Sequence, residues 1–220
     1  NIHIHNNAIS FSGEHGIYFQ GSNSLIENNK IFNNKKSGIK LASYNDELFN
    51  ASKDYYIGSN NIIRGNLVYN NVKENKTSAG IYLQAPLKNI LVENNNCYNN
   101  YHGIRTTSVY SKRVDNRRTE LNDITISNNK VKNNRGISLW IEGGNNINIL
   151  KNEGDNLVTT TKGNNVKMDS FVLEKNIINK IILQNLNGGK IIDNEYKEID
   201  IKKSNSKMSI KEFERKNKKK

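Results

Sequence analysis

A Gly-Ile pair recurs five times along the chain, and basic, aromatic and amide residues accompany it. The pair opens the segments Gly16-Ile17-Tyr18-Phe19, Gly38-Ile39-Lys40-Leu41, Gly80-Ile81-Tyr82-Leu83, Gly103-Ile104-Arg105-Thr106 and Gly136-Ile137-Ser138-Leu139. If each Ile points inward, its neighbours point outward, because side chains alternate along a strand. Outward Lys and Arg bind carboxylate or sulfate groups, and outward aromatic rings can stack on sugars. These segments therefore predict recognition of an acidic polymer.

Three outward columns result if the five segments stack in register, with neighbours about 4.8 Å apart. The first column, directly after the Ile, consists of Tyr18, Lys40, Tyr82, Arg105 and Ser138. The second column, two residues after the first, consists of Gln20, Ala42, Gln84, Thr107 and Trp140. The third column, directly before the Gly, consists of His15, Ser37, Ala79, His102 and Arg135. Together the columns predict a polymer-binding groove. The alternative is that the aromatic residues lie there only because they favour strands.

The elements that would position these columns follow from a second repeat, Ile-x-x-Asn-x-Ile. Its eight units contain Asn7, Asn29, Asn66, Asn95, Asn129, Asn152, Asn176 and Asn194. The shortest spacings between them, 22 to 24 residues, suit a coil of three short strands and three bends. A single coil cannot bury its apolar side chains, so the coils must stack around a common core.

The repeated Asn has a structural explanation. Asn tolerates the left-handed backbone expected at a sharp bend. Its amide can also donate to one coil and accept from the next, which would form an Asn ladder. We expect no chemistry from these residues. Cys97 replaces an Ile or Val of the repeat, so it is expected in the core.

Three insertions lengthen the spacing between units. Residues 42–61 and 107–122 each follow a Gly-Ile segment, and a shorter insertion runs from Val72 to Ala79. Insertions in solenoids tend to gather on one face, often the binding face. We therefore expect the two long insertions to wall one side of the groove. Drift in loops that tolerate extra residues is the alternative.

Both repeats resemble the short repeats of right-handed parallel β-helix proteins, the pectate-lyase-like superfamily. The resemblance covers about residues 1–200. It implies an all-β fold, a single-stranded right-handed parallel β-helix of about eight coils over residues 1–201. Because the chain starts inside a repeat, we expect further coils upstream in a longer protein. The resemblance also implies a secreted, periplasmic or cell-surface location.

Two of the superfamily's reaction classes fit the sequence poorly. Tyr101-His102-Gly103-Ile104 and Glu14-His15-Gly16-Ile17 resemble the H-G-I element of polygalacturonase-like members. Those hydrolases need a cluster of Asp residues on this face, and no Asp flanks the five segments. Calcium-dependent pectate lyases need converging carboxylates, whereas Glu14, Glu142 and Asp46 are dispersed. No metal site and no cofactor are therefore expected; the alternative is a Ca²⁺ ion held without a clear carboxylate cluster.

The remaining relatives carry out metal-independent β-elimination or C5 epimerisation on uronates. This chemistry needs a cation to neutralise the carboxylate, a base, and a second proton carrier. Among the outward residues, Arg105 or Lys40 could neutralise the carboxylate, His102 could be the base, and Tyr82 could donate or accept the second proton; no motif of the superfamily fixes these roles. The expected substrate-binding residues are Tyr18, Gln20, Gln84, Arg135, Trp140 and His15.

Two other classes stay open. A non-catalytic β-helix stalk, adhesin or glycan-binding surface module would use the same face without turnover. A phage tail-spike-like depolymerase would be trimeric, whereas a lyase, an epimerase or a non-catalytic module is expected to be a monomer. In each case the expected partner is an acidic polysaccharide.

Residues 202–220 form a basic tail after the repeats. Nine Lys or Arg against Glu212 and Glu214 give this tail +7 of the chain's net charge of +12. Ser209-Ile-Lys-Glu212 has the pattern of a capping box and predicts a short helix over the last coil. The chain has no nucleic-acid-binding motif and no apolar run long enough to span a membrane, so neither partner is expected.

Overall fold

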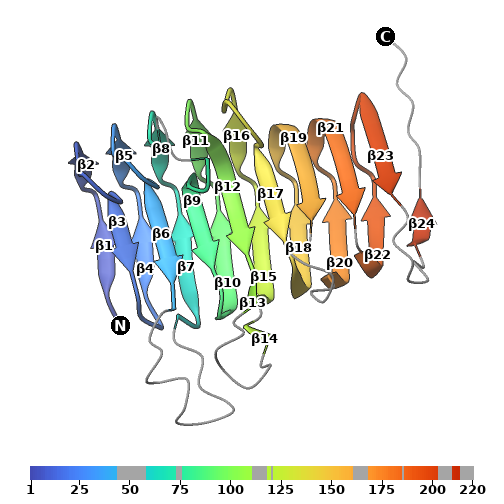
Figure 1. Cartoon of the computed structure of the whole chain (residues 1–220), viewed down its shortest axis with the longest axis horizontal. Helices are drawn as coiled ribbons and strands as arrows, with labels where there is room; N and C mark the ends of the chain where they lie inside the picture. The colour runs from blue at the N-terminus through green and yellow to red at the C-terminus, as the bar shows by residue number, and fades with distance from the viewer. Residues whose placement is uncertain are drawn as a thin grey trace.

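The computed structural model describes residues 1–43, 58–72, 76–110, 118–119, 121–160, 168–184, 186–202 and 210–213. Within these ranges every regular element is a strand, and strands of successive coils pair side by side along a rod (Figure 1). The same ranges contain no helix that is long and apolar enough to cross a bilayer. The predicted all-β parallel β-helix of about eight coils is confirmed.

The first strand of each coil joins a nine-stranded parallel sheet, here called sheet A. In spatial order its members are β1 (His3–His5), β4 (Leu25–Glu27), β7 (Asn61–Arg64), β10 (Leu87–Glu93), β15 (Leu121–Ser127), β18 (Gly144–Leu150), β20 (Met168–Glu174), β22 (Leu186–Ile192) and β24 (Ile210–Phe213). Each coil therefore hydrogen-bonds to the next along the whole rod.

The remaining coil strands form a 13-stranded sheet, sheet B, with two arms. One arm contains β2 (Ala8–Ser10), β5 (Lys30–Phe32), β8 (Leu67–Tyr69), β11 (Asn96–Tyr98) and β16 (Lys130–Lys132). The other contains β3 (Ile17–Phe19), β6 (Ile39–Ala42), β9 (Ala79–Gln84), β12 (His102–Thr107) and β17 (Leu139–Glu142). This second arm carries the predicted columns.

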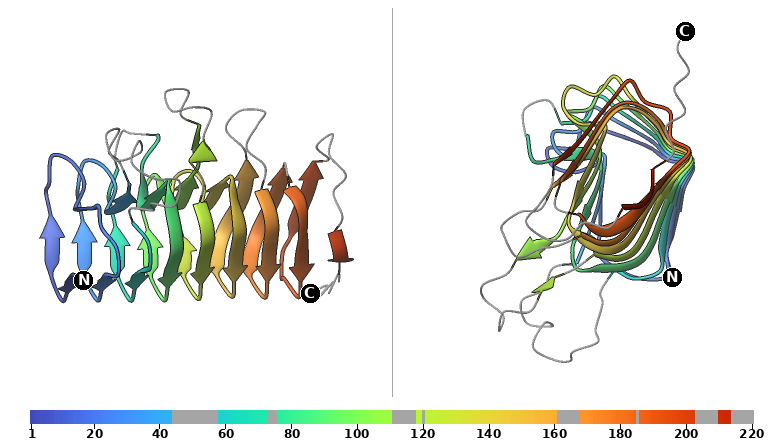
Figure 2. Two further views of the ribbon diagram at one scale, coloured as in Figure 1. Left: turned by 90° about the horizontal axis from the view of Figure 1, so that it is seen from below. Right: turned by 90° about the vertical axis from the view of Figure 1, so that its right-hand side faces the viewer.

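The two arms merge in β19 (Glu153–Thr160), which pairs with both β16 and β17. Beyond it, β21 (Ile177–Gln184) and β23 (Glu198–Lys202) continue as single long strands. The coils therefore change from three strands to two, which the end-on view of the stacked coils lets the reader follow (Figure 2). Outside the coils, β13 (Val109–Tyr110) and β14 (Arg118–Thr119) form a short antiparallel pair.

The core consists of aliphatic side chains that alternate inward along each strand. On sheet A, one buried row runs through Ile26, Ile63, Val92, Ile126, Ile149 and Leu173, which pair in register. On the first arm of sheet B, Cys97 lies fully buried between Val68 and Val131. Burial raises the pKa of the Cys97 thiol, so this residue is an inert part of the core, as predicted.

The eight repeated Asn residues form one continuous ladder, as predicted. At its centre, Asn129 Oδ1 accepts both the backbone N–H (2.9 Å) and the Nδ2–H (3.0 Å) of Asn95. Asn129 Nδ2 donates to the carbonyl oxygens of Val92 (2.9 Å) and Ser127 (3.0 Å) and to Asn152 Oδ1 (3.0 Å). A second ladder, which the sequence analysis did not separate from the first, passes through Asn34, Asn71, Asn100 and Asn134.

The prediction that the ladder Asn itself adopts the left-handed conformation is wrong by one residue. The preceding residue turns the chain instead, with φ of 54° at Asn28, 55° at Asn94 and 54° at Lys151. The ladder Asn is thereby left free to align its amide with those of neighbouring coils. Because Asn precedes Asn in half of the units, the sequence pattern did not distinguish the two positions.

The predicted C-terminal helix is also wrong where the structure describes it. Residues Ile210–Phe213 form strand β24, which pairs in parallel with β22 and shifts register between Gly189 and Ile191. A strand gives the backbone groups of the β22 edge hydrogen-bond partners, which a helix lying across that edge would not do. Ser209, the proposed cap, lies outside the described residues.

The ladder geometry predicts a large stability loss for Asn129→Ala. This substitution removes five hydrogen bonds at a buried position and leaves backbone groups of Asn95 and Val92 unsatisfied. We expect the free energy of unfolding to fall by about 2–4 kcal/mol, measured by urea denaturation. Asn148→Ala on the outer side of β18 is the control and should change it little, because none of the hydrogen bonds described involves that side chain. Equal losses for both variants would contradict this account.

Candidate functional site

The outward column on the second arm of sheet B is present, but its last member differs from the prediction. Strand pairing aligns Tyr18 with Lys40, Lys40 with Tyr82, Tyr82 with Arg105, and Arg105 with Trp140. The predicted last member, Ser138, is fully buried. Because Ile104 pairs with Leu139 rather than with Ile137, the fifth segment is shifted by two residues.

The same shift changes the other two columns. Glu142 takes the place predicted for Trp140 and pairs with Thr107. His102 pairs with Ala79 as predicted, whereas Arg135 lies outside that column, on the bend before it, where its backbone N–H donates to Asn100 O. The alternation Leu139-x-Ile141, matched to Ile104-x-Thr106, was the sequence signal for this register.

The column is a cation–π stack in which aromatic and basic residues alternate. Lys40 Nζ lies 5.0 Å from the ring centroid of Tyr18 and 5.7 Å from that of Tyr82. Arg105 Cζ lies 5.3 Å from the ring centroid of Tyr82 and 4.1 Å from that of Trp140. Each cation is therefore placed between two rings, and the two cations are separated by Tyr82.

Arg105 is buried, so the prediction that it is exposed to substrate is wrong. Only 3% of the residue is accessible. Its Nε and Nη2 atoms donate to Glu142 Oε2 at 2.8 and 2.6 Å, and its Nη1 atom donates to Thr77 O. Thr107 Oγ1 also donates to Glu142 Oε2 at 2.8 Å. The charge that the sequence assigned to a substrate carboxylate is thus neutralised within the protein, by a Glu that the sequence analysis had set aside.

His102 is likewise buried, and both of its ring nitrogens are occupied by the backbone. Nδ1 accepts from Ile137 N–H at 2.9 Å, so the neutral ring carries its proton on Nε2, which donates to Lys76 O at 3.1 Å. Its ring contacts that of Trp140 edge-on, with centroids 4.7 Å apart. Burial lowers the pKa of His102. The residue is 5% accessible, so the prediction that it is exposed on the groove is wrong.

The exposed part of the column lies over the first three coils. Tyr18 is 51% accessible, and Lys40 and Tyr82 are half-buried. Burial, with a smaller contribution from Lys36, lowers the pKa of Lys40. Gln20 is exposed and donates from Nε2 to Tyr18 Oη at 3.0 Å, and Gln84 is half-buried. Aromatic, cationic and amide groups therefore meet on one accessible strip.

His15 borders this strip. Its Nδ1 atom accepts from Ser37 N–H at 3.0 Å, and its ring centroid lies 5.6 Å from that of Tyr18. Burial, followed by the charges of Lys40 and Lys36, lowers the pKa of His15 from 6.5 to about 4. The imidazole is therefore neutral at physiological pH.

The insertions can be followed only in part. Residues 44–57 and 111–117, which make up most of the two predicted walls, lie outside the described residues. At the end of the shorter insertion, Lys76 and Thr77 present the carbonyl oxygens that bind His102 and Arg105. This segment is thus part of the buried cluster rather than of an open groove.

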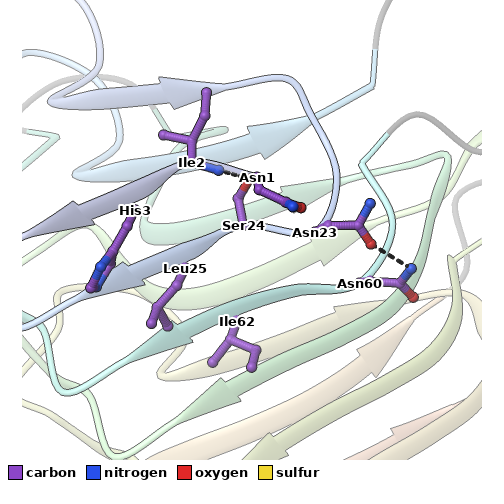
Figure 3. A pocket seen from close by; sticks show the side chains of 8 residues that line it. All are labelled: Asn1, Ile2, His3, Asn23, Ser24, Leu25, Asn60 and Ile62. Carbon is purple, nitrogen blue, oxygen red and sulfur yellow. Dashed lines mark hydrogen bonds between the residues drawn. The ribbon is translucent and has the colours of Figure 1, made fainter.

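One hollow of about 460 Å³ lies elsewhere, on sheet A near β1, β4 and β7 (Figure 3). Its lining residues are Asn1, Ile2, His3, Asn23, Ser24, Leu25, Asn60 and Ile62. None belongs to the predicted columns. Among the residues that the structure describes, no three His, Cys, Asp or Glu side chains come together in a group that could hold a metal ion.

Comparisons with known proteins agree with this architecture. A family model described as "Right handed beta helix region" matches residues 1–171. A comparison with curated proteins finds no match. Two solved structures, both from Azotobacter vinelandii, resemble the chain: the A-modules of the mannuronan C-5 epimerases AlgE4 and AlgE6, with TM-scores of 0.70 and 0.65 and 16% identity each.

The structural match covers 96% of this chain and 58% of the AlgE4 module, and 94% of this chain and 57% of the AlgE6 module. The chain therefore spans little more than half the length of these modules. At 16% identity the likeness shows a shared fold.

The buried ion pair predicts that Glu142→Ala is strongly destabilising. It would leave the Arg105 guanidinium buried without a counter-charge, and breaking a buried pair in this way costs about 3–5 kcal/mol. Urea denaturation followed by the fluorescence of Trp140, the chain's only tryptophan, measures the loss. Glu198→Ala, which breaks an exposed pair with Lys180, should have little effect. A small loss for Glu142→Ala would contradict the buried cluster.

The lowered pKa of His15 predicts how stability changes with pH. Between about 6.5 and 4 the unfolded chain binds more protons at this residue than the folded protein does. The free energy of unfolding should therefore decrease as pH falls through this window. His15→Asn, which can still accept from Ser37 N–H, should make that decrease smaller. The decrease should not vanish, because the lowered pKa of His102 also makes the free energy of unfolding depend on pH. Denaturation at several pH values tests this, and an unchanged pH dependence would contradict it.

Proposed function

This chain belongs to the right-handed β-helix family, and on that premise we propose that it binds an acidic, uronate-containing polysaccharide along the exposed strip of Tyr18, Lys40 and Tyr82. The main support for this proposal is the position of Lys40 between two accessible aromatic rings. Its Nζ atom lies 5.0 Å from the ring centroid of Tyr18 and 5.7 Å from that of Tyr82. Such a polymer would be met outside the cytoplasm, so a secreted or cell-surface location is part of the proposal.

The chemistry of the strip supports an acidic sugar chain over other polymers. Lys40 offers a cation for a uronate carboxylate. The rings of Tyr18 and Tyr82 offer apolar surface, and Gln20 and Gln84 offer amide groups that can hydrogen-bond to hydroxyls. The combination of stacking surface, cation and amides is typical of sites that bind sugars of this type.

The reaction that this strip would support is proton abstraction at C5 of the uronate. Lys40 neutralises the carboxylate, the phenolate form of Tyr82 removes the C5 proton, and the electron pair moves into the carboxyl group. Return of a proton from water to the opposite face of C5 completes epimerisation. Breaking the C4–O bond instead, with a proton delivered to the departing oxygen, completes β-elimination. Tyr82 is the accessible proton carrier beside Lys40, and His102 and Arg105 hold the neighbouring strand in place.

The relatives give this reaction class its support. The two solved modules that share the fold belong to mannuronan C-5 epimerases. Their substrate is an acidic polysaccharide, as proposed here from the side chains of the strip.

The second candidate is a non-catalytic glycan-binding module. This candidate is favoured because neither His102 nor Arg105 is available to a substrate. Both ring nitrogens of His102 are hydrogen-bonded to the backbone, and Arg105 is paired with Glu142. These are two of the residues that the sequence analysis assigned to catalysis. A binding module would need only the exposed strip.

Polyuronates of different composition would test the proposal. Calorimetry should detect binding to polyuronates, and Lys40→Gln should weaken it about tenfold or more, as expected for one charged hydrogen bond. Lys190→Gln, an exposed lysine on sheet A, is the control and should bind as the wild type does. Absence of wild-type binding to every polyuronate would refute the proposal.

Turnover separates the two candidates. An epimerase would exchange the C5 proton for deuterium in heavy water, which NMR detects, and a lyase would generate the ultraviolet absorbance of a C4–C5 double bond. Tyr82→Phe keeps the aromatic ring and removes the hydroxyl, so it should retain binding and lose turnover. Binding without deuterium exchange or absorbance would establish the non-catalytic module.

A further inference from the structure

We propose that His15 and Lys40 form a carboxylate-binding pair at the β3–β6 end of the strip. In this pair the Nε2–H of a neutral His15 donates to one carboxylate oxygen and Lys40 binds the other. The inference rests on the proposed function and deepens it, because it assigns the uronate carboxyl group to one place on the rod.

The two H-G-I histidines provide the first argument, because they share one backbone contact and differ in the other. In each, Nδ1 accepts the N–H of a residue in the next coil, Ser37 for His15 and Ile137 for His102. In His102 the Nε2 atom donates to Lys76 O. The part of the chain described by the structure offers no such partner to Nε2 of His15. The hydrogen bond from Ser37 fixes the orientation of the His15 ring and leaves its Nε2–H available to a ligand.

The tautomer provides the second argument. A neutral imidazole carries one proton, and a nitrogen that accepts a hydrogen bond does not carry it. The N–H of Ser37 therefore places the proton of His15 on Nε2. This atom can donate to an anion, but it cannot act as a base without losing the contact with Ser37. His15 thus suits recognition rather than proton abstraction.

The charges around His15 provide the third argument. Glu14, its nearest acidic neighbour, is paired with Lys36 at 2.5 Å. Lys40 is the cation of the strip whose charge acts most strongly on His15. The Tyr18 ring contacts both residues, with its centroid 5.6 Å from that of the His15 ring and 5.0 Å from Lys40 Nζ. A neutral donor and a cation that contact the same aromatic ring match a carboxylate attached to a sugar ring.

Two substitutions separate the two roles of His15. In His15→Asn, Oδ1 can replace Nδ1 as the acceptor for Ser37 N–H, but the Nε2 donor is lost. In His15→Gln, the longer amide can present an N–H near the position of Nε2. We expect His15→Asn to raise the Kd for a uronate oligosaccharide about tenfold while the Tm stays close to that of the wild type, since a hydrogen bond to a charged group is lost. His15→Gln should bind more tightly than His15→Asn.

Two controls make the result specific. His5→Asn, a histidine on sheet A, should bind as the wild type does. The carboxyl-reduced oligosaccharide should bind weakly to the wild type and equally weakly to His15→Asn. In NMR spectra, the Nε2–H resonance of His15 should shift when the uronate oligosaccharide is added and stay unchanged with the reduced one.

The outcomes distinguish this inference from the proposed function. If His15→Asn binds the uronate oligosaccharide as tightly as the wild type while Lys40→Gln binds more weakly, the His15 inference is overturned and the proposed function stands. If the wild type itself binds no uronate oligosaccharide, both are overturned. Weaker binding for both variants, with the reduced sugar insensitive to either, supports the pair.

Discussion

Backbone hydrogen bonds between successive coils hold equivalent residues about 4.8 Å apart, and the rest of the structure depends on that spacing. At this distance the side chains of equivalent residues in successive coils are close neighbours. Asn residues satisfy one another in the buried ladder. On the first arm of sheet B, Phe32, Tyr69 and Tyr98 stack with centroids 5.2 and 5.0 Å apart. Like charges would repel at this spacing, and Tyr82 between Lys40 and Arg105 separates two cations that would otherwise be neighbours.

The same constraint divides the outward column into two parts with different roles. Over the fourth and fifth coils, Arg105 is covered by Glu142, Trp140 and the segment at Thr77, and becomes part of the protein interior. Over the first three coils, Tyr18, Lys40 and Tyr82 keep their outer sides accessible. One repeating pattern thus supplies both a stabilising cluster and a surface that can take a ligand. A residue's position along the rod decides which of the two it joins.

The sequence predicted the architecture well and the site only in part. The eight Asn units specify the coils because each amide is needed by its neighbours, so spacing and structure agree. Glu142 was missed because local patterns set the fifth segment two residues away from its real register. The burial of His102 and Arg105 depends on carbonyl groups of Lys76 and Thr77 in the preceding coil, and no local pattern encodes that contact. The helix predicted after Ser209 failed because pairing with the β22 edge outweighs a capping pattern.

The central claim is that ligand contacts lie over the first three coils of the column, with the Arg105 cluster serving as scaffold. A crystal structure of the protein soaked with a uronate oligosaccharide would test it most directly. The account predicts sugar density along β3, β6 and β9, with a carboxylate beside Lys40 and with the Arg105–Glu142 pair intact. Sugar bound to Arg105 or His102 after displacement of Glu142, or bound only at the hollow on sheet A, would contradict it.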